Sequence, residues 1–371
     1  MRTKSLDRQT DRQTDNPCLT NLQQKPSSFA KFFVLITTLF SSLAFFACGP
    51  DDTNNGGGVK PGDRARGAIN IGVTEYEKTE EVYIVVPGTQ AVVAMTDDSS
   101  WDTYYDGSND WMKGVFIKDR TVTLSAFVMG KYEVTQELYE DVMGSNPSNF
   151  TSDADDGETQ KLRPVEKVTW YDAAAFCNKL TEILGIKDAN GKIDYAYYTN
   201  DTYVTHYTSG TAIAYKQDSK GYRLSTEAEW EFAARGGNTE AAAWKYAFAG
   251  VPTESTNQSQ FTSHNTDGNL ANYGWYYNNS ENKTHEVGKK TANSLGLFDM
   301  SGNVWEWCWD WYATVSAETV TNPTGQASGS YRVNRGGGWN DSAYSCAVSF
   351  RRFTTPDNAT IYLGFRVCRS L

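Results

Sequence analysis

An unbroken alternation of tryptophans constrains this chain more than any other feature, since residues 304–311 read VWEWCWDW. Successive side chains of a β-strand point to opposite faces, so a strand here places its tryptophans together on one face. The opposite face then carries Glu306, Cys308 and Asp310. A stripe of large aromatic side chains is more often core than ligand platform, so we predict a strand that contributes its tryptophan face to a buried core.

Composition and charge exclude several classes of function for the 371 residues. The formal net charge of -11 argues against nucleic-acid binding and against docking on anionic lipid, because both need a basic surface. The six cysteines contain no CxxC pair, and the three histidines form no cluster in sequence, so a zinc site of the thiolate or HExxH type is not expected.

The N-terminal part has the pattern of an export signal with a lipid anchor. Lys31 precedes a short apolar run at residues 32–47, shorter than the roughly 20 residues of a membrane-spanning helix. The run ends at Ala47, followed by Cys48 and Gly49, which resembles a lipobox in which Cys48 is acylated. An ordinary secretion signal is the alternative. We therefore divide the chain into a leader at 1–47, a Gly- and Asn-rich tether at 48–67 and one domain at 68–371.

Local signals in the domain predict a few short elements separated by long loops. Residues 69–73 and 82–86 read as strands. Thr135, Thr169 and Thr226 each stand where a cap is needed before a helix, and glycines follow the helices of residues 136–143 and 170–184 and stop the third at residues 236–237. Cys177 lies on the apolar face of the second helix and is expected to be buried. Beyond residue 237 regular periodicity fades.

Four motifs in this domain resemble those of the formylglycine-generating-enzyme, or sulfatase-modifying factor, family. Residues 221–233 read GYRLSTEAEWEFA, residues 295–307 read LGLFDMSGNVWEW, residues 335–339 read RGGGW and residues 363–367 read LGFRV. They occur in the family's order over roughly residues 80–369. The resemblance implies an α+β, C-type-lectin-like, loop-rich fold.

The same resemblance bears on catalysis. Family enzymes oxidise a substrate cysteine with copper(I) held by two cysteines, and soft thiolates are the ligands that copper(I) prefers. The matching positions here are Asp341 and Cys346, and Gly338 replaces a substrate-contacting serine. One thiolate cannot form the two-coordinate site, so we expect no copper and no such activity. Cys346 is then either a buried small side chain or the partner of Cys308 in a disulfide, which we favour in an exported protein.

A structural calcium site is also implied by the resemblance. The family binds calcium beside the GNVWE motif, and the matching positions are Asp299, Gly302, Val304 and Glu306. Two side-chain carboxylates and two backbone carbonyls form the hard oxygen set that calcium prefers. The alternative is that Glu306 only accepts hydrogen bonds from nearby backbone amides.

The segment of residues 340–362 has an unusual composition. It contains no Lys, Glu, Gln, Met or Trp, and every residue type present can be encoded by a codon of the form NNC. Randomised adenines in AAC codons give that pattern, and the segment resembles the variable region of lectin-fold surface proteins diversified by retroelements. We take 335–367 as the variable region. Its expected contact residues, between family scaffold positions, are Asn340, Asp341, Tyr344, Phe350, Arg352, Phe353, Thr355, Asp357, Asn358, Thr360, Ile361 and Tyr362.

The sequence therefore favours a binding protein over an enzyme. The expected protein is a lipoprotein of the outer membrane or cell surface that holds an extracellular protein or glycan through aromatic and small polar side chains, as antibody paratopes do. A formylglycine-generating oxidoreductase and a structural envelope lipoprotein without a specific ligand are the alternatives.

Overall fold

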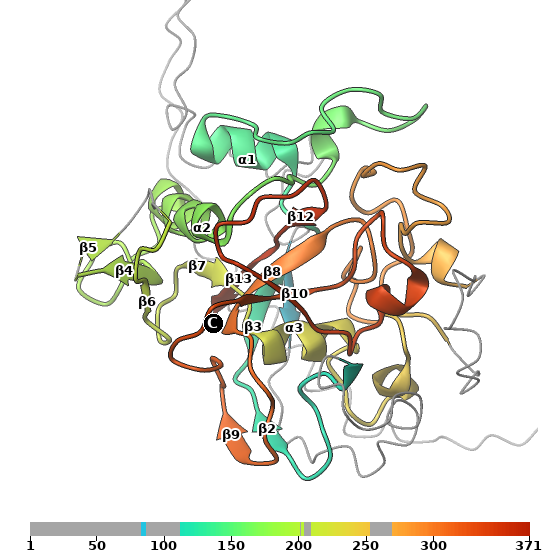
Figure 1. Cartoon of the computed structure of the whole chain (residues 1–371). Helices are drawn as coiled ribbons and strands as arrows, with labels where there is room; N and C mark the ends of the chain where they lie inside the picture. The colour runs from blue at the N-terminus through green and yellow to red at the C-terminus, as the bar shows by residue number, and fades with distance from the viewer. Residues whose placement is uncertain (1–82, 87–111, 201, 204–208, 253–268) are drawn as a thin grey trace, which may run out of the picture. The chain divides into compact units, whose positions relative to one another are not determined.

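Figure 1 shows the computed structural model of the chain, which describes residues 83–86, 112–200, 202–203, 209–252 and 269–371. All of them fall within one compact unit, residues 58–371. The leader, Cys48, the tether and the strand expected at 69–73 lie outside the described residues. Within the described ranges, no helix has the length and apolarity to cross a bilayer.

The three helices lie where their capping residues predict. They are α1 (Gln136–Met143), α2 (Trp170–Leu184) and α3 (Glu227–Ala234). Thr169 and Thr226 accept hydrogen bonds from the backbone N–H three residues on, and the acidic side chains there return them, which completes two capping boxes. Gly144 and Gly185 end α1 and α2 in the left-handed conformation that glycine adopts without strain.

One antiparallel sheet joins the two ends of the domain. Its strand order is β1 (Tyr83–Val86), β3 (Phe127–Gly130), β13 (Val367–Ser370) and β7 (Tyr222–Leu224). The predicted strand at 82–86 is thus confirmed as β1. The last strand of the chain is held between two much earlier ones, which closes the domain.

A second sheet is built on the tryptophan strand β8 (Trp305–Trp311). Its order is β11 (Arg352–Thr354), β10 (Arg332–Arg335), β8 and β12 (Leu363–Gly364), and β12 runs parallel to β8. Only Phe365 and Arg366 separate β12 from β13 of the first sheet, so this link joins the two sheets (Figure 1).

The remaining regular structure is small. β2 (Thr121–Thr123) pairs with β9 (Thr319–Thr321), and β4 (Tyr197–Thr199) lies between β5 (Thr202–Tyr203) and β6 (Ala214–Tyr215). Among the described residues, four short 3-10 turns interrupt the loops, at Gln160–Leu162, Ala242–Lys245, Leu270–Asn272 and Ala343–Cys346. The predicted α+β, loop-rich class is confirmed.

Both faces of β8 are buried. Trp305, Trp307 and Trp309 belong to a core cluster with residues of α1 and α2, as the alternation predicts. On the opposite face, Cys308 packs in a second cluster with residues of α3, and the Glu306 and Asp310 side chains beside it are also buried. The strand therefore separates two cores, and its polar face needs internal partners for its charges.

Candidate ligand-binding face

Buried charges on α3 fix the backbone that carries the candidate contact residues. Arg351, between β10 and β11, donates to both oxygens of Glu227, at 2.7 and 2.8 Å. Arg335, at the end of β10, donates to Glu231 at 2.6 Å. Burial alone would raise the pKa of Glu227, but Arg351 and Arg335 outweigh it and hold that pKa below its usual value. Both pairs therefore lock the segment onto α3.

A third buried pair anchors the other end of the segment. Arg366 donates to both oxygens of Glu306 on β8, at 2.7 and 2.6 Å. The indole of Trp230 on α3 donates to the same carboxylate at 2.7 Å. The arginines of the RGGGW and GFRV motifs are thus the internal partners of acidic side chains in the other two motifs.

Scaffold and candidate contact residues interleave along the segment. The scaffold positions 335–339, Arg351 and 363–366 are all buried. All twelve candidate residues are at least partly exposed, and Phe353 is 42% exposed. The buried arginine pairs hold the backbone of the segment, and the twelve candidate side chains along it reach solvent.

Five of the twelve candidate residues line one cavity of about 410 Å³. They are Asp341, Tyr344, Phe350, Arg352 and Phe353, and Trp305, Ser345 and Arg351 complete the wall. The Arg352 guanidinium lies 5.1 Å from the ring centres of both Trp305 and Tyr362, and 3.7 Å from an Asp341 oxygen. The wall therefore combines aromatic surface with one partly exposed ion pair.

The other seven candidates do not line this cavity. Thr355, Asp357 and Asn358 lie at the turn after β11, where the backbone N–H of Asn358 donates to Thr355. Backbone carbonyls of Thr360 and Ile361 accept from Lys167 and from the Trp339 indole, so those residues also have structural contacts. Asn340 directly precedes Asp341. Tyr362 contacts two residues of the cavity wall, since its ring lies 5.1 Å from the Arg352 guanidinium and its carbonyl accepts from the Trp305 N–H at 2.8 Å.

Asp341, which stands at the first family cysteine position, makes hydrogen bonds within the face. One of its oxygens accepts from the Trp305 indole at 2.6 Å and from the Gly338 backbone at 3.2 Å. Burial raises its pKa, although Arg352 and the Trp305 hydrogen bond favour the charged form. Both donors would lose their acceptor if the carboxylate were removed.

The predicted Cys308–Cys346 disulfide is wrong. Both thiols are free and buried, as are those of Cys177 and Cys368. Cys308 packs in the cluster beside α3, whereas Cys346 packs against Ala247, Phe248 and other residues of a third cluster. Burial raises the pKa of Cys346 well above its usual value, so its reactive thiolate is disfavoured. Both cysteines are small core side chains, and the burial predicted for Cys177 is confirmed.

The positions expected to bind calcium fit that ion in part. Asp299 is buried, and its Oδ1 has no hydrogen-bond partner among the described residues. Burial is the main cause that raises its pKa to about 6, and Glu306 adds to the effect. Glu306, however, already accepts hydrogen bonds from Arg366 and Trp230 on both oxygens. Calcium at Asp299, Gly302, Val304 and Glu306 therefore stays a prediction.

Three aromatic residues of this region are not among the predicted contacts. Trp305 is predicted as core, and it is buried, yet it forms one wall of the cavity. Tyr312 and Tyr331 pack on Phe353, with ring centres 4.3 and 5.1 Å away. Tyr331 is 43% exposed and directly precedes β10, and none of the sequence motifs includes it.

Several known proteins are similar to this chain in sequence. Residues 72–371 match the sulfatase-modifying factor enzyme 1-like domain. A protein named chaperone protein LppX, from Paenibacillus barcinonensis, is 35% identical over 68% of this chain and 83% of its own length. The formylglycine-generating enzyme of Streptomyces coelicolor is 38% identical over 44% of this chain, and the aligned part spans about half of that enzyme.

Solved structures agree on the fold. Treponema denticola variable protein 1 superposes with a TM-score of 0.59 and 38% identity, covering 78% of this chain and 94% of that protein. A structure described as CarF, at 24% identity and a TM-score of 0.52, shares the fold alone. With four motifs in order, their arginines and acids paired in the core and a match over most of its length, the chain belongs to the sulfatase-modifying factor enzyme 1-like family and has its C-type-lectin-like fold.

Proposed function

We propose that this protein binds a protein ligand through the face formed by residues 340–362, with the cavity at Trp305 as its centre. The observation that carries the proposal is the interleaving described above: buried arginines hold the backbone, and every candidate contact residue reaches solvent. Aromatic side chains and arginine dominate the binding energy of interfaces, and Tyr344, Phe353 and Arg352 supply both here. The likeness to a variable protein and to a relative named as a chaperone favours a macromolecular partner.

Site-specific photo-crosslinking tests this proposal even while the ligand is unidentified. Benzoylphenylalanine replaces Phe353 in one variant and Tyr203, which is 46% exposed on β5, in a matched control. After irradiation of cells that produce each variant, we expect a discrete protein adduct at position 353, lost on adding Tyr344→Ser. The same adducts at position 203, or none at position 353, contradict the proposal, and a carbohydrate adduct assigns a glycan instead.

Diversification of this face by a retroelement belongs to the same proposal. It rests on the restricted residue types of 340–362 and on the likeness to Treponema denticola variable protein 1. A nearby reverse transcriptase gene, with a near-copy of the 3′ coding end that differs at adenines, is the expected observation. A genome without either feature contradicts diversification, while ligand binding by a fixed face would stand.

Formylglycine generation is not proposed for this chain. The copper site would need thiolates at both Asp341 and Cys346, and the Asp341 carboxylate accepts hydrogen bonds from Trp305 and Gly338. We expect no aldehyde, seen as a mass loss, when the chain is incubated with copper(I), oxygen and a CxPxR peptide. Conversion by the wild-type chain would restore the enzymatic alternative.

Display at the cell surface through acylated Cys48 completes the proposal, and the lipobox-like sequence at residues 45–49 supports it. Labelled fatty acid should enter the wild-type chain and not a Cys48→Ser variant, which should also leave the membrane fraction. Unchanged labelling of that variant excludes this anchor. A structural lipoprotein without a ligand is the outcome if the anchor is present and crosslinking fails.

A further inference from the structure

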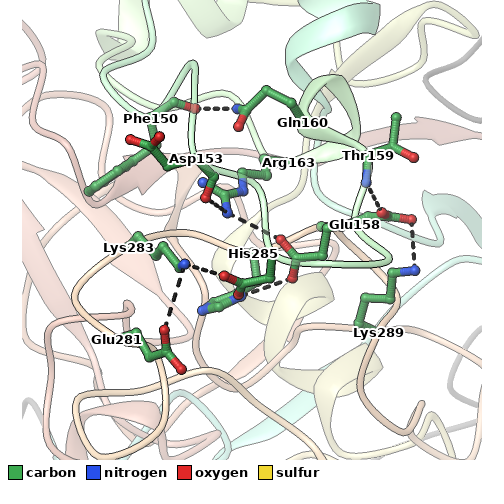
Figure 2. Close-up of polar contacts among 12 residues, drawn as sticks. Phe150, Asp153, Glu158, Thr159, Gln160, Arg163, Glu281, Lys283, His285 and Lys289 are labelled. Carbon is green, nitrogen blue, oxygen red and sulfur yellow. Dashed lines mark hydrogen bonds and ion pairs between the residues drawn. The ribbon is translucent and has the colours of Figure 1, made fainter.

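A buried histidine faces two carboxylates on the loop that precedes the Gln160–Leu162 turn. His285 Nδ1 lies 2.9 Å from Glu158 Oε1 and 3.3 Å from Asp155 Oδ2. These three ligand atoms lie within 4.8 Å of one another. Figure 2 shows the Glu158 carboxylate and the His285 ring turned toward each other. The two acids come from a loop far from the histidine in sequence, since Glu158 precedes it by 127 residues.

The second ring nitrogen determines what the first one can do. His285 Nε2 lies 2.8 Å from the backbone oxygen of Ser280, and a carbonyl oxygen only accepts, so Nε2 carries a hydrogen. In a neutral ring, Nδ1 then presents a lone pair to two carboxylate oxygens, which repels it. A shared proton or a metal ion between these groups removes that repulsion, so the geometry suits a bound cation.

The surroundings leave the inner carboxylate oxygens available to a metal ion. The other oxygen of Glu158 pairs with Arg163 at 3.2 Å, and the other oxygen of Asp155 pairs with Lys283. Stacking on Trp275, with ring centres 3.7 Å apart, holds the His285 ring in place. The histidine and Glu158 side chains are buried, whereas Asp155 is 38% exposed, which leaves an open side for entry and for a water ligand.

We propose that Asp155, Glu158 and His285 bind a divalent transition-metal ion of the Zn²⁺ type. One imidazole nitrogen and two carboxylate oxygens are a zinc-type donor set, and the open side leaves room for water as the fourth ligand. The ring hydrogen given to a backbone carbonyl is the outer contact that usually orients a metal-binding histidine. On binding, the ion would take the place of any proton held between Nδ1 and the carboxylates, and that proton would go to solvent.

Such an ion would connect two loops behind the proposed ligand-binding face. The loop that carries His285 also carries Ser280, whose hydroxyl donates to the Trp339 backbone at 2.7 Å, and Tyr277, whose N–H donates to the Asp341 backbone at 2.9 Å. The metal therefore has a structural role here: it would stabilise the loop on which the start of the face rests. Metal binding at this site can be measured without any protein ligand, so its test is independent of the proposed function.

The test is titration of the full chain, purified metal-free in detergent, with Zn²⁺ and with Co²⁺ as a spectroscopic probe. We expect one more bound ion in the wild type than in Asp155→Asn or His285→Gln, visible d–d absorption of Co²⁺, and proton release on binding. Each variant should weaken this site by more than about 100-fold, since loss of even an outer contact costs roughly 10- to 100-fold. Glu281→Gln, a 75% exposed acid that pairs with the same Lys283, should bind like the wild type.

Three results overturn the proposal. In the first, the wild type binds no more Zn²⁺ than the variants do, which means that no metal ion occupies the site. Asp155→Asn binds as tightly as the wild type, in which case the ion lies elsewhere. Ca²⁺ displaces Co²⁺ at equal concentration, in which case the histidine nitrogen is not a ligand. If His285→Gln does not fold, the partly exposed Asp155 still provides the decisive variant.

Discussion

The strand β8 and the segment of residues 340–362 both contribute to the second sheet, but they differ in how their side chains are buried. In β8, every residue from Trp305 to Asp310 is buried, on both faces of the strand. In the segment, buried residues such as Arg351 alternate irregularly with exposed ones such as Phe353. The strand is packed on both faces, whereas the segment has a backbone held by buried arginines and candidate side chains that reach solvent. Substitutions of those exposed side chains should therefore cost less stability than substitutions in β8.

The largest expected effect concerns the buried strand β8. Trp307→Ala removes a 1% exposed indole that donates to the Val168 carbonyl at 3.0 Å. We expect a loss of about 3–5 kcal/mol in unfolding free energy, because the cavity collapses only partly. Chemical denaturation measures it, with Tyr203→Ala as an exposed aromatic control. A loss below about 1 kcal/mol in Trp307→Ala would mean that β8 is not core.

The next effect concerns the link between the two regions. Glu227→Gln leaves the buried Arg351 without its charge partner, and such a change typically costs about 3 kcal/mol or more. The variant should therefore lose stability and also loosen the segment, which hydrogen exchange at residues 350–354 measures. Glu318→Gln, an exposed acid of the same region, is the control. Stability lost without faster exchange in the segment would show that the pair serves the core alone.

A pH effect distinguishes the polar face of β8 from the exposed segment. Burial, with Glu227 nearby, raises the pKa of Asp310 to about 7 from 3.8. A raised acid pKa contributes stability that is complete below the unfolded value and is lost as pH rises through the folded value. Between about pH 4 and 7, the wild type should therefore lose stability relative to Asp310→Asn, by at most about 1.4 kcal/mol per pH unit.

Thermal melts of both proteins across this window measure the difference, and above pH 7 it should become constant. Asparagine keeps an oxygen that can accept the Glu227 N–H, so the variant isolates the charge. Asp357→Asn, in the exposed turn after β11, should show no such divergence. A constant difference between wild type and Asp310→Asn over the whole range would contradict the burial of this carboxylate.

Local signals in the sequence predicted much of this structure, whereas distant pairings were out of reach. Capping residues placed the helices because Thr169 and Asp172 act within one turn. Family matches at 335–339, Arg351 and 363–366 marked scaffold positions that are buried in the structure. The sequence could not pair Glu158 with His285 or place Trp305 beside Asp341, since loops bring these residues together. The disulfide prediction failed because cysteine spacing does not determine connectivity.

The smallest expected effect tests whether the segment is a surface. Phe353→Ser removes a 42% exposed ring that contacts Tyr312 and Tyr331, and exposed changes usually stay within about 0.5 kcal/mol. Tyr362→Ser should cost more, because Tyr362 is partly buried against the main core cluster and contacts Arg352. Tyr344→Ser should lie between them, since Tyr344 is partly buried and its ring packs on Phe350. Thermal melts rank the three, and each should stay far below Trp307→Ala. If Phe353→Ser destabilises as much as Trp307→Ala, the segment is core, and no surface remains there for a ligand.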